Sequence, residues 1–111
     1  MMIKFLIVFL LLFSACNPYT NCNKDIGETE SFYVQNYGKP QKSKILTLSE
    51  GTNLHEYQGA LIAHLRKGEI KDIKEMYWEK GKHSMVIWFE MKKGKWRAMD
   101  CLNWNNSRIQ Y

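Results

Sequence analysis

Hydrophobic and polar positions alternate most regularly in the last third of the chain. Residues 84–91 are apolar in nearly all positions of both alternating sets, which is typical of a central strand buried on both faces. Residues 70–78 and 96–104 flank this segment, and tight turns that contain Gly81 and Gly94 join the three. The pattern therefore predicts a three-stranded antiparallel meander.

The meander carries most of the large aromatic residues. In its last strand Trp96, Ala98, Leu102 and Trp104 align, with Asp100 interrupting, so a regular strand would present them on one face. A sheet face that helices leave uncovered would form an aromatic patch suited to binding a protein, a peptide or a glycan. The candidate residues for this open face are Met76, Trp78, Val86 and Trp88.

Upstream of the meander the pattern predicts helices and a strand. Residues 28–37 begin with acidic side chains and are followed by Gly38 and Pro40, which predicts a short helix. Residues 44–48 are predicted as a short strand. Between residues 54 and 66 apolar positions recur at helical spacing and favour a second helix. Lys-Gly turns recur every 13 residues and would also suit a further meander strand here, so that alternative stays open.

Together these elements predict one small α+β domain. An antiparallel meander of three to four strands would carry one or two helices packed on one face. The chain has 111 residues, which is enough for one domain of this kind and not for two.

The first residues form a segment of their own. Lys4 precedes nine unbroken apolar residues at positions 5–13, and Ser14-Ala15-Cys16 follows. This order is typical of a secretory signal peptide, and the apolar run is shorter than the roughly 20 residues that span a bilayer as a helix. Phe13-Ser14-Ala15-Cys16 resembles the bacterial lipobox, which implies that residues 1–15 are removed and that Cys16 carries the lipid anchor.

The lipobox resemblance divides the chain into a signal peptide (1–15), a lipidated tether (16–27) and the α+β domain (28–111). It implies the bacterial cell envelope. Asp at the position of Asn17 would favour inner-membrane retention, so its absence indicates the outer membrane. With Cys16 acylated, Cys22 and Cys101 remain as an even pair in an oxidising compartment. A disulfide between them is predicted, and two free thiols are the alternative.

Charge and histidine placement narrow the classes of partner. The formal net charge is +5, and the basic residues are dispersed along the chain. This excess permits contact with anionic lipid headgroups or an acidic partner, but it does not indicate nucleic acid. His55, His64 and His83 lack the spacing of metal ligands, so neither a metal nor a cofactor is expected.

The acidic residues give a weak signal for catalysis. Asp72 and Glu75 lie among lysines and are expected to be their solvated partners. Glu90 and Asp100 are the acids on otherwise apolar strands, and a carboxylate pair could act as acid and base. No phosphate loop or nucleophile motif accompanies them, so we expect that the protein is not an enzyme.

Three features resemble the small outer-membrane assembly lipoproteins of the SmpA/BamE type: the lipobox, a helix that ends in Tyr37-Gly38-Lys39-Pro40, and the terminal meander. Trp78-Glu79-Lys80-Gly81 also faintly resembles the lipoprotein inhibitors of lysozyme. The leading hypothesis is a non-catalytic, lipid-anchored envelope protein whose sheet face binds an envelope protein or glycan. The alternatives are a periplasmic inhibitor or immunity-type protein that blocks an enzyme, and an envelope hydrolase that uses Glu90 or Asp100.

Overall fold

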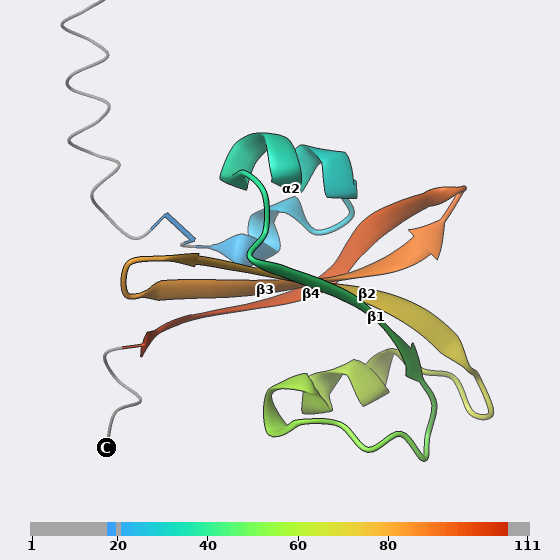
Figure 1. Ribbon diagram of the computed structural model, residues 1–111. Helices are drawn as coiled ribbons and strands as arrows, with labels where there is room; N and C mark the ends of the chain where they lie inside the picture. The colour runs from blue at the N-terminus through green and yellow to red at the C-terminus, as the bar shows by residue number, and fades with distance from the viewer. Residues whose placement is uncertain (1–17, 20, 107–111) are drawn as a thin grey trace, which may run out of the picture.

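Four antiparallel strands form a single sheet in the computed structural model, which describes residues 18, 19 and 21–106 (Figure 1). The elements in chain order are η1 (Cys22–Asp25), α2 (Glu30–Tyr37), β1 (Lys42–Leu48), η2 (Glu56–His64), β2 (Lys71–Lys80), β3 (His83–Lys92) and β4 (Lys95–Asn105). The strands follow one another in the order β1-β2-β3-β4, so the α+β class and the antiparallel meander are confirmed. The predicted signal peptide and the anchor residue Cys16 lie outside the described residues.

The turns of the meander explain its regular register. Lys80 pairs with His83, and Lys92 pairs with Lys95, so each connection has only two residues. In the second turn both central residues, Lys93 and Gly94, have positive φ values of 53° and 78°. Two-residue loops of this kind match the right-handed twist of the flanking strands and set their pairing.

β3 is buried along most of its length, as predicted for a central strand. Both faces of the sheet carry apolar side chains at this strand. Each face is therefore covered by another segment of the chain (Figure 1). α2 packs on one face. The segment predicted as a helix or further strand at residues 54–66 forms the 3₁₀ element η2, and it packs on the opposite face.

α2 is fixed at both ends by specific contacts. The Thr29 hydroxyl accepts the backbone N–H of Phe32 at 3.3 Å and caps the start of the helix. At the other end the indole N–H of Trp78 donates to the carbonyl oxygen of Gly38 at 2.8 Å. Tyr33, which is fully buried, packs beneath the helix against Trp78 and Phe89.

A β-bulge in β4 overturns the expected alignment of its apolar residues. Trp88 pairs with Asp100 and the next residue of β3 pairs with Ala98, so Met99 is an extra residue in β4. One extra residue reverses which side of the sheet the following side chains face. Trp96 and Ala98 accordingly pack on the α2 side, whereas Met99 and Trp104 pack on the η2 side.

The described part of the predicted tether belongs to the folded domain. Tyr19 and Cys22 are each only 4% exposed and lie in the core beneath α2. Cys22 and Cys101 form the predicted disulfide, which joins η1 to β4. The segment continues along the outer edge of β4, where Gly27 donates to the carbonyl of Ala98 at 2.9 Å. The domain therefore begins before residue 28, because the disulfide and this edge pairing hold the segment on the sheet.

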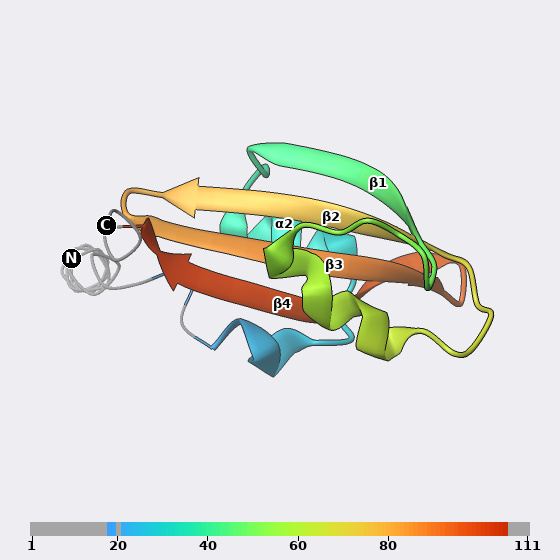
Figure 2. The same cartoon turned by 90° about the horizontal axis from the view of Figure 1, so that it is seen from below.

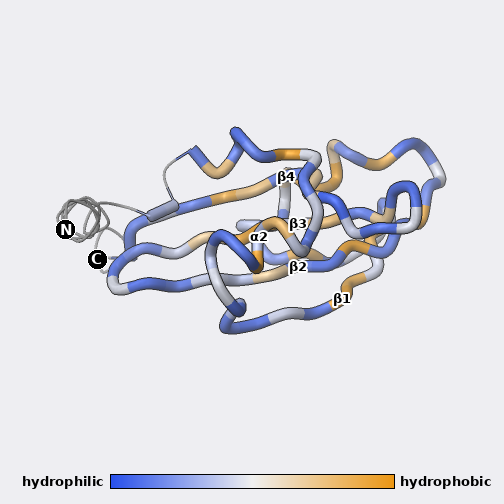
Figure 3. Tube along the Cα trace, turned by 90° about the horizontal axis from the view of Figure 1, so that it is seen from above, coloured by the Kyte–Doolittle hydropathy of each residue, from blue (hydrophilic) through white to orange (hydrophobic). Residues whose placement is uncertain are grey.

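Hydrophilic residues gather at the turns and along the first half of β1, while hydrophobic residues occupy the middle of the sheet (Figure 3). No helix within the described residues is long and apolar enough to cross a membrane.

Candidate binding site

The four residues predicted to form one open face do not share a face. Met76 and Trp78 are 4% and 1% exposed beneath α2, while Val86 and Trp88 are each 2% exposed on the η2 side. The register explains the error. Trp78 lies opposite Met85, and Val86 lies opposite Tyr77. Directly opposite residues share a face, so the two predicted pairs must point in opposite directions.

A different part of the η2 face is open. η2 crosses only part of the sheet, and the end of the sheet where β2 finishes and β3 begins is left uncovered (Figure 2). A groove of about 840 Å³ lies there. It is lined by Lys42, Ser43 and Lys44 of β1, Tyr57 of η2, Glu75 and Tyr77 of β2, Val86 of β3, and Leu102 and Trp104 of β4.

Aromatic rings border this groove. Tyr77 and Trp104 lie with their ring centroids 6.1 Å apart. On the η2 side the ring of Tyr57 stacks on Trp88 with centroids 6.3 Å apart, and the ring of His55 stacks on Tyr57 with centroids 5.9 Å apart. Tyr57 and Leu102 are each 39% exposed, so the groove presents apolar surface that a partner could cover.

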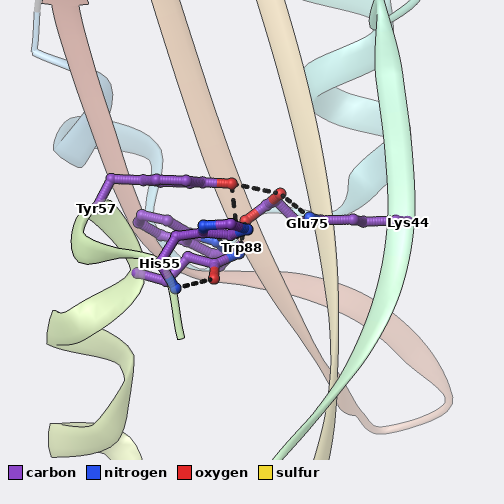
Figure 4. A network of polar contacts seen from close by, with 6 residues as sticks. Lys44, His55, Tyr57, Glu75 and Trp88 are labelled. Atoms are coloured by element: carbon purple, nitrogen blue, oxygen red, sulfur yellow. Dashed lines mark hydrogen bonds and ion pairs between the residues drawn. The ribbon is translucent and has the colours of Figure 1, made fainter. Parts of the chain in front are cut away.

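Glu75 is the central polar residue of the groove (Figure 4). Its side chain is only 7% exposed. Oε1 accepts hydrogen bonds from Gln58 Nε2 at 2.7 Å and from Trp88 Nε1 at 2.8 Å. Oε2 accepts from the Tyr57 hydroxyl at 3.2 Å and lies 3.4 Å from Nζ of Lys44. The expectation that Glu75 is a solvated partner of lysines is wrong, because η2 covers it and supplies two of its donors.

These contacts tie η2 to the sheet. Gln58 is 3% exposed, and its Oε1 accepts the backbone N–H of His55 at 3.1 Å while its amide group reaches Glu75. Burial raises the pKa of Tyr57, and the charge of Glu75 and the hydrogen bond to it raise this pKa further. Tyr57 thus stays protonated and donates to Glu75, which fixes its ring at the wall of the groove.

The β1 side of the groove is positively charged. The Lys44 side chain is 53% exposed, and Nζ of Lys42 lies 5.8 Å from the centroid of the Tyr77 ring. The Tyr77 hydroxyl donates to the Glu79 carboxylate and lies 3.0 Å from Oγ of Ser84. Burial is the main cause that raises the pKa of Tyr77, so this phenol is also neutral. The groove therefore combines neutral aromatic walls with two ammonium groups.

The acids considered for catalysis lie outside the groove lining, and each has a basic partner. Glu90 lies 3.1 Å from Nζ of Lys71 and 3.7 Å from Nζ of Lys92. Asp100 lies 3.1 Å from Nε2 of His64 and accepts the backbone N–H of Cys101 at 2.8 Å. Within residues 18, 19 and 21–106, no group of three or more His, Cys, Asp or Glu side chains could hold a metal ion.

One signal for the groove is visible in the sequence. Glu75 lies between Ile73 and Tyr77 in the set of alternating positions that faces η2, and a charged residue in such a set indicates a buried polar site. Comparison of the chain with protein-family models, curated proteins and solved structures found no match. The interpretation of the groove therefore depends on its own geometry and chemistry.

Proposed function

We propose that this protein is a non-catalytic binding protein of the bacterial envelope, anchored by a lipid on Cys16. It binds another envelope component through the groove beside η2. The observation that carries this proposal is the groove itself, an open apolar surface bordered by Tyr57, Tyr77 and Trp104, with two lysines on one side. Aromatic residues with a few placed charges are typical of recognition surfaces.

The polar groups of the groove favour binding over catalysis. Glu75 has both carboxylate oxygens engaged by donors, so it is not placed to accept a proton from a substrate. The hydroxyls of Tyr57 and Tyr77 each donate to a carboxylate. The ammonium groups of Lys42 and Lys44 are exposed and can contact an anionic partner, and that of Lys44 also lies 3.4 Å from Oε2 of Glu75.

The proposed location follows from the sequence and agrees with the disulfide. The lipobox-like Phe13-Ser14-Ala15-Cys16 supports lipidation at Cys16, and Asn17 supports the outer membrane. The Cys22–Cys101 disulfide is of the kind that persists in oxidising compartments such as the periplasm.

The anchor is tested by the intact mass of the protein extracted from membranes of a bacterial host. A chain that begins at Cys16 with added acyl mass supports the proposed anchor. A chain that retains Met1 would contradict it, and a cleaved chain without lipid would mean a secreted domain.

The groove is tested by placing a photo-reactive amino acid at Leu102 and cross-linking in intact cells. The matched control is the same probe at Val34, which is 38% exposed on α2, on the other side of the sheet. We expect a defined envelope component to be captured from Leu102 and not from Val34. Equal capture from both positions, or none from Leu102, would contradict a binding role for the groove. Capture only of an added foreign enzyme would instead favour the inhibitor alternative.

A further inference from the structure

We propose that the partner is an extended acidic segment of another protein, which pairs along the free edge of β1 as a fifth strand. Its side chains on one face would enter the groove beside η2. This inference depends on the proposed function, because it names the class of partner for the same site.

The two edges of the sheet differ in a way that supports strand addition. The outer edge of β4 is paired with the chain itself, since Ala98 exchanges backbone hydrogen bonds of 2.9 Å with Gly27 and Glu28. β1 forms the other edge, and no described segment pairs with its outer side (Figure 2). Near the end of β1 the carbonyl of Thr47 accepts a hydrogen bond from the Thr52 hydroxyl. An edge with unpaired backbone groups is a template for an added strand.

The free edge and the groove are one continuous surface. Lys42, Ser43 and Lys44 belong to β1 and also line the groove. A strand paired to β1 would lie about 4.8 Å from it, so every second side chain would reach the groove wall. The remaining side chains would face the side of Ile45, which is 54% exposed. An added strand would thus bury apolar surface on both of its faces.

The positive charge on the edge of β1 favours an acidic strand as the binding partner. Lys42 and Lys44 point to the groove side of β1, as their partners Tyr77 and Glu75 do. A second copy of this chain paired edge to edge would bring its own lysines against these, and like charges on neighbouring strands destabilise the pairing. A strand with acidic residues would instead form charge pairs with them.

The groove is poorly equipped to bind a neutral glycan. Sugar hydroxyls need acceptors as well as donors, and the acceptor side chain of Glu75 is already fully engaged. The hydroxyls of Tyr57 and Tyr77 are also occupied. The ammonium groups of Lys42 and Lys44 favour an anion. An anionic glycan satisfies this chemistry but makes no use of the unpaired β1 backbone, so we favour the peptide.

The test uses the full chain, produced in a bacterial host, purified in detergent and immobilised. Random linear peptides displayed on phage are selected on it, and the enriched peptides are then synthesised. We expect acidic residues in alternation with apolar ones. Affinity should fall at least roughly tenfold in the Lys42→Glu/Lys44→Glu variant. It should be unchanged in the control Lys24→Glu/Lys67→Glu, which alters the charge equally at exposed positions outside the groove.

Backbone methylation separates strand pairing from charge attraction. Two versions of each peptide carry N-methyl groups on one or the other set of alternating residues. Only one set of N–H groups can point at β1, so one version should lose roughly tenfold or more in affinity and the other should not. Equal binding of both versions would overturn strand addition while leaving the Leu102 cross-link, and hence the groove, intact.

Two further outcomes would also overturn the inference. One is the absence of enriched acidic peptides. The other is binding of an anionic polysaccharide such as hyaluronan, lost in Lys42→Glu/Lys44→Glu, when no selected peptide binds. The second result would assign the groove to acidic glycans.

Discussion

The indole N–H of Trp88 donates a 2.8 Å hydrogen bond to Oε1 of Glu75, and the two residues lie directly opposite each other on β3 and β2. Gln58 and Tyr57 of η2 donate to the same carboxylate. One acid thus holds two strands and η2 together at the wall of the groove. Loss of this acid should affect both the stability of the fold and the position of Tyr57.

Glu75 and Lys44 form an ion pair whose two members should contribute unequally to stability. Glu75→Ala leaves the buried donors of Trp88 and Gln58 without an acceptor, and we expect a loss of about 3 kcal/mol in the free energy of unfolding. Lys44→Ala removes an exposed ammonium group and should cost less than about 1 kcal/mol. Urea denaturation of both variants measures the difference. Equal losses would show that the charge pair, and not the buried donors, determines the stability.

The partial or complete burial of five tyrosines predicts a loss of stability at alkaline pH. Burial is the largest cause that raises the pKa in each of five tyrosines: Tyr19, Tyr33, Tyr37, Tyr57 and Tyr77. Unfolded tyrosine ionises near a pKa of about 10. The stability that depends on the protonated phenols is therefore complete below that pH and declines as the pH rises above it, towards the higher pKa values of the folded protein.

Phenolate absorbance and far-ultraviolet circular dichroism, recorded together during an alkaline titration, test this expectation. The phenolate signal of these tyrosines should rise only as the dichroism of the folded protein is lost. Tyr111 lies outside the described residues, so the signal of a single phenolate is not decisive. Ionisation of several tyrosines near pH 10 with unchanged dichroism would contradict the burial of their hydroxyls.

The disulfide should be a major source of stability. Cys22 and Cys101 are separated by 79 positions, and closing a loop of that length is worth about 4 kcal/mol by chain entropy. Cys22→Ser/Cys101→Ser should therefore lower the free energy of unfolding by about this amount, as should a reducing agent added to the native protein. The reducing agent should have no further effect on the double variant. Any such effect would mean that the reducing agent acts on something other than the Cys22–Cys101 bond, because the double variant keeps only Cys16 of the three cysteines.

Two glycines should respond in opposite directions to replacement by alanine. Gly94 has a φ of 78° in the β3–β4 turn, a conformation that alanine adopts at a cost of about 1 to 2 kcal/mol. Gly59 lies in η2 with an ordinary φ and open space at its Cβ position, so Gly59→Ala should stabilise by about 0.5 to 1 kcal/mol. We therefore expect the melting temperature of Gly94→Ala to lie below that of the wild type and the melting temperature of Gly59→Ala to lie above it. A lower value for Gly59→Ala would mean that the added methyl group disturbs η2.

The fold was predictable where local chemistry determines it. The two-residue turns at Gly81 and Gly94 and the apolar runs between them predict β2, β3 and β4 to within two residues at every end. The position of η2 was not predictable in this way. Its apolar residues fit either a helix or a strand, and its place on the sheet depends on Gln58 and Tyr57 meeting Glu75, which lies 17 residues further along the chain than Gln58.

The candidate site was harder to predict, because it depends on which side chains share a face. Trp78 and Trp88 look equivalent in the sequence, but the register that places Trp78 opposite Met85 puts these tryptophans on opposite sides of the sheet. In β4 the extra residue at the bulge reverses the direction of Leu102 and Trp104 relative to Ala98. The sequence could predict that part of a sheet face is open. It could not predict which residues form that face, because this depends on the register of the strands.

The disulfide also has a mechanical consequence. Tension applied to the chain ahead of Cys22 enters the folded domain through the covalent link to Cys101, without first unravelling α2. β4 and β1 are the two outer strands, so the part of a load that enters at Cys101 and is resisted at Lys44 crosses every strand pairing of the sheet. The sheet would therefore share that load across all of its strands.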